Sequence, residues 1–258
     1  MTRSSLCLLL FASCLWGSEI RAAEDCPTAA DDIEVDRPDI TNSSVVVPVA
    51  SLQLENGINL TRQTSATTLD GTNSRLRLGV AHCLEVLADV PNYTRSLQGS
   101  GASGFSDVAP AVKRQLGPLR GNIELSAALG LGLPTGAKAI AGRGYEPYLQ
   151  FPWSHPISDD WQITGMLTTF WYPGQPTDRE TLETTFSLER ELGFRADLFM
   201  EFVGDYPSSS APSQFMNFGG AYRVTRLQQL DFHTGFGLDT RAPKAFIGIG
   251  YSWRWDHL

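Results

Sequence analysis

Charged side chains recur at every second position over long stretches of this 258-residue chain. Alternate residues of a β-strand face the same side, so such side chains would together line one surface. Carboxylates on a shared surface attract cations, and arginines attract anions. The candidates for this lining are Arg75, Arg77, Glu85, Asp107, Glu124, Glu183, Glu189, Asp197, Glu201, Asp231, His233 and Arg254. The pattern fits either a selectivity lining along a solute path or a closed network of arginine–carboxylate pairs.

His233 is the histidine that falls within this alternation, and the sequence gives little support for a catalytic role of this residue. A serine lipase needs a serine beside a histidine that a third polar group orients, and no serine in such a context accompanies His233. The sequence also has no Cys-x-x-Cys pair, no cysteine–histidine cluster and no glycine-rich phosphate loop before a helix. We therefore predict no enzymatic activity, no metal site and no cofactor.

The composition excludes two further classes of protein. The net charge is -8, and a general nucleic-acid binder needs a basic face to neutralise phosphates. The mean hydropathy is -0.14, and no apolar run reaches the roughly 18 residues of a membrane-spanning helix. A membrane β-barrel stays open as an interpretation, because only every second residue of its strands must be apolar.

The N-terminus has the pattern of a secretory signal peptide. Arg3 precedes an apolar stretch, Leu6–Trp16, and small residues follow at Ala22 and Ala23. We predict a cleaved signal peptide over residues 1–23 and export from the cytoplasm. Cys26 and Cys83 then remain in the exported chain, where they either form one disulfide or stay as thiols.

Residues 24–50, here called the leader, are acidic and rich in proline, and they have no helical or strand periodicity. The leader contains a short charged unit, Asp36-Arg37-Pro38-Asp39, whose backbone the proline restricts. Its arginine can reach a carboxylate inside a barrel, and either aspartate can reach an arginine such as Arg77. We therefore predict that the leader plugs a lumen, with a periplasmic tail as the alternative. The plug candidates are Asp36, Arg37, Pro38, Asp39 and Thr41.

From residue 51 the chain alternates between apolar and polar residues with period two, which predicts strands. The predicted strands are 51–62, 74–81, 84–93, 105–115, 121–132, 144–154, 161–172, 180–190, 194–205, 214–224, 229–239 and 244–256. Most have about ten residues or more, which is the length of a tilted strand that crosses a bilayer.

The connections between these strands alternate in length. Short gaps such as Glu191–Gly193 and Thr225–Gln228 alternate with longer, glycine- or serine-rich ones such as Thr94–Gly104 and Tyr206–Ser213. Outer-membrane barrels have short periplasmic turns and long external loops, and tryptophan and tyrosine near strand ends fit their aromatic girdles. We predict an all-β fold over residues 51–258: a transmembrane, antiparallel, up-and-down barrel of about twelve strands. A soluble sandwich or lipocalin-like barrel is the alternative.

The chain resembles the family described as the putative MetA-pathway of phenol degradation. The resemblance rests on the leader Ile33–Gly57 (IEVDRPDITNSSVVVPVASLQLENG), on Ser103–Leu116, on Leu133–Gly136 and on the ending Leu227–Arg254. It covers essentially the whole exported chain and implies an outer-membrane, transporter-like barrel. It transfers no functional residue to this sequence.

These observations lead to one function and two alternatives. We expect a channel in the outer membrane of a Gram-negative bacterium that takes up small solutes passively, with aromatic or apolar molecules as candidates. The alternatives are a sealed barrel with a structural or interaction role and a lipid-modifying enzyme of the outer membrane. The expected partners are outer-membrane lipid, the barrel-assembly machinery and a small-molecule solute that the sequence does not identify.

Overall fold

The computed structural model describes residues 26–98, 101–141 and 144–258. The predicted signal peptide, residues 1–23, lies outside the described residues. In the part of the chain that is described, no helix is long and apolar enough to cross a membrane.

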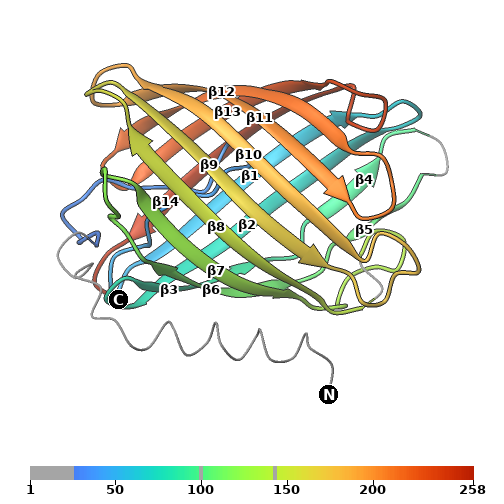
Figure 1. Ribbon diagram of the computed structural model, residues 1–258, viewed down its shortest axis with the longest axis horizontal. Coiled ribbons are helices and arrows are strands. Elements are labelled where there is room, and N and C mark those ends of the chain that lie inside the picture. Colours follow the sequence, from blue (N-terminus) through green and yellow to red (C-terminus); the bar gives the residue numbers. More distant parts are fainter. Residues whose placement is uncertain (1–25, 99–100, 142–143) are drawn as a thin grey trace.

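The described residues form one antiparallel sheet that closes on itself (Figure 1). The first strand pairs with the second strand on one side and with the last strand on the other, so no edge of the wall is left open. The strands are β1 (Leu52–Arg62), β2 (Thr67–Ala81), β3 (Leu84–Asp89), β4 (Tyr93–Ser96), β5 (Ser103–Phe105), β6 (Ala109–Gln115), β7 (Glu124–Gly132), β8 (Glu146–Pro156), β9 (Trp161–Trp171), β10 (Glu180–Glu191), β11 (Ala196–Pro207), β12 (Ser213–Thr225), β13 (Gln228–Gly237) and β14 (Ala245–Trp255).

Twelve of these strands make the closed wall, in which β3 pairs directly with β6. The short strands β4 and β5 form a hairpin that pairs with the first part of β2 and extends the wall beyond the β3–β6 ladder. The predicted all-β, antiparallel, twelve-strand barrel is therefore confirmed.

The wall buries polar side chains and exposes apolar ones, which is the reverse of a water-soluble fold. Large side chains that are fully buried include Arg77, Lys113, Gln53, Gln115, Glu55, Glu85 and Glu201. Large apolar side chains with substantial exposure include Leu129, Leu198, Phe232, Phe236 and Ile249. A surface of this kind is stable in hydrocarbon and not in water, so the apolar face is the lipid face. This excludes the soluble alternative.

The two ends of the barrel differ in their connections. One end, here called the short-turn end, carries the connections 82–83, 116–123, 157–160, 192–195 and 226–227, of which only 116–123 is longer than four residues. The other, here called the long-loop end, carries 63–66, 133–145, 172–179, 208–212 and 238–244, of which only 63–66 is as short as four residues. The C-terminus and the blue leader lie at the same end in Figure 1, and β4 and β5 lie toward the opposite end.

Two predicted connections are wrong. The connection expected at Thr94–Gly104 contains most of β4 and the start of β5, which pair with each other, and β4 also pairs with β2. Residues 63–73 were expected to form a long loop, but β2 already begins at Thr67 and continues to Ala81. Polar residues dominate this part of β2, so apolar alternation is weak there. Threonines at 67, 68 and 72 favour extended backbone, and pairing with both β1 and β4 gives the segment two ladders.

The leader is attached covalently to the short-turn end. A disulfide joins Cys26 to Cys83 in the β2–β3 turn, with the two Cα atoms 5.4 Å apart. The bridge ties the beginning of the described leader to the wall, 57 residues further along the chain. His82 lies beside the two sulfurs, and while the bridge is intact they are not thiolate ligands for a metal.

Replacing a lipid-facing residue with arginine tests the inside-out arrangement. Ile249, which is 60% exposed near the middle of β14, would place its substituted charge in hydrocarbon. We expect Ile249→Arg to lower the free energy of unfolding by about 2–4 kcal/mol, measured by urea titration in lipid vesicles. Phe194→Arg, in the turn between β10 and β11, is the control and should change it by about 0.5 kcal/mol at most. An equal loss in both variants would contradict the assignment of the lipid face.

Candidate functional site

The leader makes a return excursion into the barrel from the short-turn end. On its way in, the Ile33 amide donates to the Arg226 carbonyl in the β12–β13 turn at 2.8 Å. On its way out, Val49 bridges to Gly79 near the end of β2, and β1 begins at Leu52. Between these two points the leader contacts the inward faces of strands from every side of the wall, so it lies within the lumen.

Asp36 pairs with three cations of the wall. Its carboxylate lies 3.0 Å from Arg75 Nη1, 3.2 Å from Arg77 Nη1 and 3.6 Å from Lys113 Nζ. Burial alone would oppose its ionisation, but the charges of Arg77, Lys113 and Arg75 outweigh that effect and hold the pKa of Asp36 well below its usual range. Asp36 is therefore an anion that the neighbouring cations stabilise.

Arg77 is fully buried at the centre of this network. Its guanidinium pairs with Glu55 and with Glu85, each at 3.1 Å. It also donates to two leader carbonyls, to Glu34 at 3.2 Å and to Val45 at 3.1 Å. One arginine thus holds the inward and the returning limb of the leader together.

Arg37 points to the neighbouring part of the wall, formed by β13, β14 and β1. Its Nη2 lies 3.2 Å from Asp231 Oδ1 on β13. Glycines at 57 and 250 make room for it, because a Cβ at Gly57 would overlap the guanidinium and one at Gly250 would lie 2.7 Å from Nε. The adjacent residues Asp36 and Arg37 therefore bind walls of opposite charge.

Glu201 on β11 binds the tip of the leader. Its carboxylate accepts hydrogen bonds from the Ile40 amide, from the Thr41 amide at 2.8 Å and from the Thr41 hydroxyl at 2.7 Å. The Asn217 amide donates to the same carboxylate at 2.9 Å. The Thr41 hydroxyl also lies 2.5 Å from that of Thr185 on β10. These neutral donors fix the tip without bringing a counter-charge.

Asp39 has no arginine partner in the described structure. Burial, together with the nearby carboxylates of Glu201 and Glu189, raises the pKa of Asp39 well above its ordinary value. The two aspartates of the charged unit thus lie in opposite environments, Asp36 among cations and Asp39 among carboxylates. Pro38, between them, is buried.

The returning limb binds the wall through polar side chains and backbone amides. Asn42 Nδ2 donates to Gln150 at 3.1 Å, and Ser44 Oγ lies 2.8 Å from Ser154 Oγ. The Val46 amide donates to Gln115 at 3.2 Å, and the Val47 amide donates to Glu85 at 2.7 Å. Side chains of the wall thereby accept hydrogen bonds from backbone amides of the leader that do not pair with a strand.

The predicted lining residues other than His233 fall into three groups. Those that contact the leader are Arg75, Arg77, Glu85, Glu201, Asp231 and Arg254; the last donates to the Asp31 and Asp32 carbonyls at 2.7 and 3.1 Å. Those bonded elsewhere are Asp107, which accepts from the Gly136 amide in a long loop, Glu124, which accepts from Gln115, and Glu189, which accepts from Gln162 and Thr164. Glu183 and Asp197 line cavities.

His233 is buried on β13 between two asparagines. Its Nδ1 lies 3.2 Å from Asn217 Oδ1, and its Nε2 lies 3.0 Å from Asn59 Oδ1. Asparagine therefore occupies both ring nitrogens, and in the described residues no serine lies at hydrogen-bond distance from either. This arrangement does not form the serine–histidine pair of a hydrolase.

Sequence reasoning missed Lys113, Gln53, Gln115 and Asn217 among the inward-facing residues. Lys113 completes the cation group around Asp36, and Gln53 donates to Glu55 at 2.8 Å and to the Glu34 carbonyl at 2.7 Å. The signal was present in the alternation, because Lys113 and Gln115 share the inward parity of β6. Strand parity identifies such residues, whereas charge alone does not.

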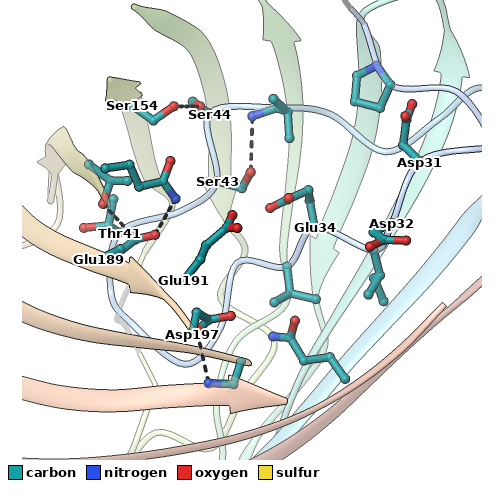
Figure 2. A pocket seen from close by; sticks show the side chains of 18 of the residues that line it. Asp31, Asp32, Glu34, Thr41, Ser43, Ser44, Ser154, Glu189, Glu191 and Asp197 are labelled. Atoms are coloured by element: carbon teal, nitrogen blue, oxygen red, sulfur yellow. Dashed lines mark hydrogen bonds between the residues drawn. The ribbon is translucent and has the colours of Figure 1, made fainter. Parts of the chain in front are cut away.

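Cavities remain on both sides of the leader tip. The short-turn cavity has a volume of about 750 Å³, and Figure 2 shows carboxylates of the leader and of the wall around it. These carboxylates are Asp31, Asp32, Glu34, Glu189, Glu191 and Asp197. The long-loop cavity has a volume of about 440 Å³ and is lined by Phe170, Tyr172, Thr181, Glu183, Asp205, Pro207, Ala211, Ser213 and Arg241.

The family model for the putative MetA-pathway of phenol degradation matches residues 35–255, which is most of the chain. The chain belongs to this family. The match begins inside the leader and ends with β14, so the family pattern includes the segment that lies in the lumen as well as the wall.

Solved outer-membrane proteins share the fold of this family member at low sequence identity. The COG4313 outer membrane channel from Pseudomonas putida F1 has a TM-score of 0.66 and 14% identity over 86% of this chain and 100% of its own. The NanC porin has a TM-score of 0.56 and 8% identity over 78% and 98% of the two chains. The CymD monoaromatic hydrocarbon channel has a TM-score of 0.50 and 13% identity over 81% and 90%. No curated protein matches the chain.

Removing the charge of Asp36 tests the attachment of the leader. Asp36→Asn leaves three cations with one fewer counter-charge, and breaking a buried ion pair on one side costs about 3–5 kcal/mol. We expect the amides of residues 40–47 to exchange with deuterium at least about 100-fold faster than in the unaltered protein.

Asp32→Asn is the matched control, because Asp32 forms an exposed ion pair with Arg223 at 3.0 Å. Asp32→Asn should change the deuterium exchange rate of these amides by less than about fivefold, since exposed ion pairs contribute about 0–1 kcal/mol to stability. Unchanged exchange in Asp36→Asn would mean that the ion pairs do not hold the leader in place.

Proposed function

We propose that this protein is an outer-membrane channel for the passive uptake of small solutes. The observation that carries the proposal is a polar lumen with a cavity at each end and, between them, a segment that is not part of the wall. The family membership and the channels among its structural neighbours support the same function. An oriented insertion with the short turns in the periplasm follows from the usual arrangement of such barrels.

The leader acts as the internal constriction of this channel. Ion pairs and hydrogen bonds attach it to the wall beyond the disulfide at Cys26, and each of these bonds can exchange with water or with a solute. Its buried apolar side chains include Ile33, Val46 and Val47. A segment attached in this way can move without unfolding the barrel, whose strands pair with one another. The leader can thus detach at a lower free-energy cost than unfolding of the barrel wall.

The expected solutes are small and include aromatic molecules. The long-loop cavity has two aromatic side chains in its lining, and one neighbour is described as a monoaromatic hydrocarbon channel. We propose no catalytic step, because His233 is engaged by asparagines and the polar groups of the lumen bind the leader. Export by a cleaved signal peptide and insertion by the barrel-assembly machinery complete this proposal.

A sealed barrel is the second candidate, and a specific observation favours it. Arg77 is fully buried, and its network connects the leader to β1, β2, β3 and β6. A lumen closed in this way would leave the loops as the functional part. The two candidates differ in whether ions cross the protein.

Single-channel recording with and without the leader tip separates the candidates. We expect the refolded chain to give stable current steps in a planar bilayer, and deletion of residues 36–41 should raise the conductance severalfold because the constriction is removed. Both proteins must show the heat-modifiable gel mobility of a folded barrel. Unchanged conductance after deletion would overturn the plug, and an absence of current from both folded proteins would favour the sealed barrel.

A further inference from the structure

The long-loop cavity contains an aromatic pair in a lumen that is otherwise mostly polar. Phe170, on the inward face of β9, stacks on Tyr172 with ring centroids 6.3 Å apart and planes inclined by 16°. Tyr148 on β8 continues the row, with its centroid 5.8 Å from that of Phe170. Tyr148 and Phe170 are register partners near the long-loop end, where Phe170 and Tyr172 line the cavity.

Two carboxylates line the same cavity. Glu183 on β10 and Asp205 on β11 are register partners, directly opposite each other on adjacent strands. Like charges in this position destabilise a sheet unless something neutralises them. Within the described residues neither carboxylate forms an ion pair. Arg241, the cation in the lining, is an exposed residue of the β13–β14 connection.

The charges of the wall are distributed unevenly around the barrel. Arg75, Arg77 and Lys113 lie on β2 and β6 and are balanced there by carboxylates. The β10–β11 wall carries inward carboxylates with neutral hydrogen-bond partners instead: Glu201 binds the leader tip, and Glu189 lines the short-turn cavity. A low-dielectric wall lined by one sign of charge concentrates ions of the opposite sign.

We propose that the long-loop cavity captures a small organic cation, an amine that carries an aromatic or similarly apolar group. An ammonium group donates charge-assisted hydrogen bonds to Glu183 and Asp205, and it is attracted to the faces of aromatic rings. The apolar part of the ligand packs against Phe170, Tyr172 and Pro207. This inference rests on the proposed channel function and narrows its solute class, because neutral aromatics would leave the two carboxylates unbalanced and aromatic acids would be repelled by them.

Calorimetric titration of the refolded barrel in detergent micelles tests the capture site without requiring conduction. The probe is benzylammonium at pH 7, compared with benzyl alcohol and benzoate, which have the same ring and a neutral or negative group. We expect benzylammonium to bind at least about tenfold more tightly than benzyl alcohol, and benzoate to show no binding. Equal affinity for benzylammonium and benzyl alcohol, or tighter binding of benzoate, would overturn the proposal.

Variants of the lining locate the site. Glu183→Gln and Asp205→Asn should each weaken benzylammonium binding at least about tenfold, and Phe170→Ala should weaken it severalfold. Glu180→Gln is the matched control, because Glu180 is on the same strand with the opposite parity and does not line the cavity; it should leave binding unchanged. Unaltered binding in both carboxylate variants would overturn the proposal.

Current recordings on the same samples distinguish the capture site from the channel function. Binding of benzylammonium by a barrel that carries no current supports the capture site and overturns the channel function. Current without any binding supports the channel and overturns the capture site.

Discussion

The ion pairs between Asp36 and the cations Arg75, Arg77 and Lys113 are the interactions on which the lumen depends. A charge inside a barrel must be hydrated or paired, because its desolvation is expensive. Here the β2–β6 side of the wall places these three cations among its own carboxylates, Glu55, Glu85 and Asp89. The leader adds Asp36, whose carboxylate pairs with all three cations. The leader is therefore part of the electrostatic balance of the lumen.

The β10–β13 part of the wall is acidic on its inward face. Arg37 pairs with Asp231, and Glu201 is satisfied by the amides and hydroxyl of the leader tip. Most other inward carboxylates on β10 and β11 have neutral partners or face a cavity. A leader held by cations on one side and by an acidic wall on the other leaves the acidic wall as the surface along which a solute would travel. This asymmetry links the docking of the leader to the kind of solute that the channel would accept.

The fold was largely accessible from the sequence, because the lipid face and the lumen impose opposite polarity on alternate residues. That constraint identified the strands and the closed barrel, and it also explains the failure at residues 67–73, where threonine and asparagine leave no apolar alternation although β2 pairs there on both sides. The charged unit at residues 36–39 indicated that the leader would form ion pairs with side chains of the barrel lumen. The sequence did not indicate that Arg37 would meet Asp231 or that Asp39 would lie among carboxylates, because those contacts depend on strand register and on the path of the leader.

The family match extends into the leader, and both the proposed channel and the proposed capture site depend on a leader that lies inside the wall. A cross-link in intact outer membranes tests most directly whether the leader lies inside the barrel. Thr41 and Thr185 have hydroxyls 2.5 Å apart, so the account predicts that Thr41→Cys with Thr185→Cys forms an intramolecular disulfide detectable by peptide mass spectrometry. Thr41→Cys with Thr184→Cys, the neighbouring position of opposite parity, should form none. Absence of the first cross-link in a folded barrel, or equal yields from both pairs, would contradict a leader bound within the lumen.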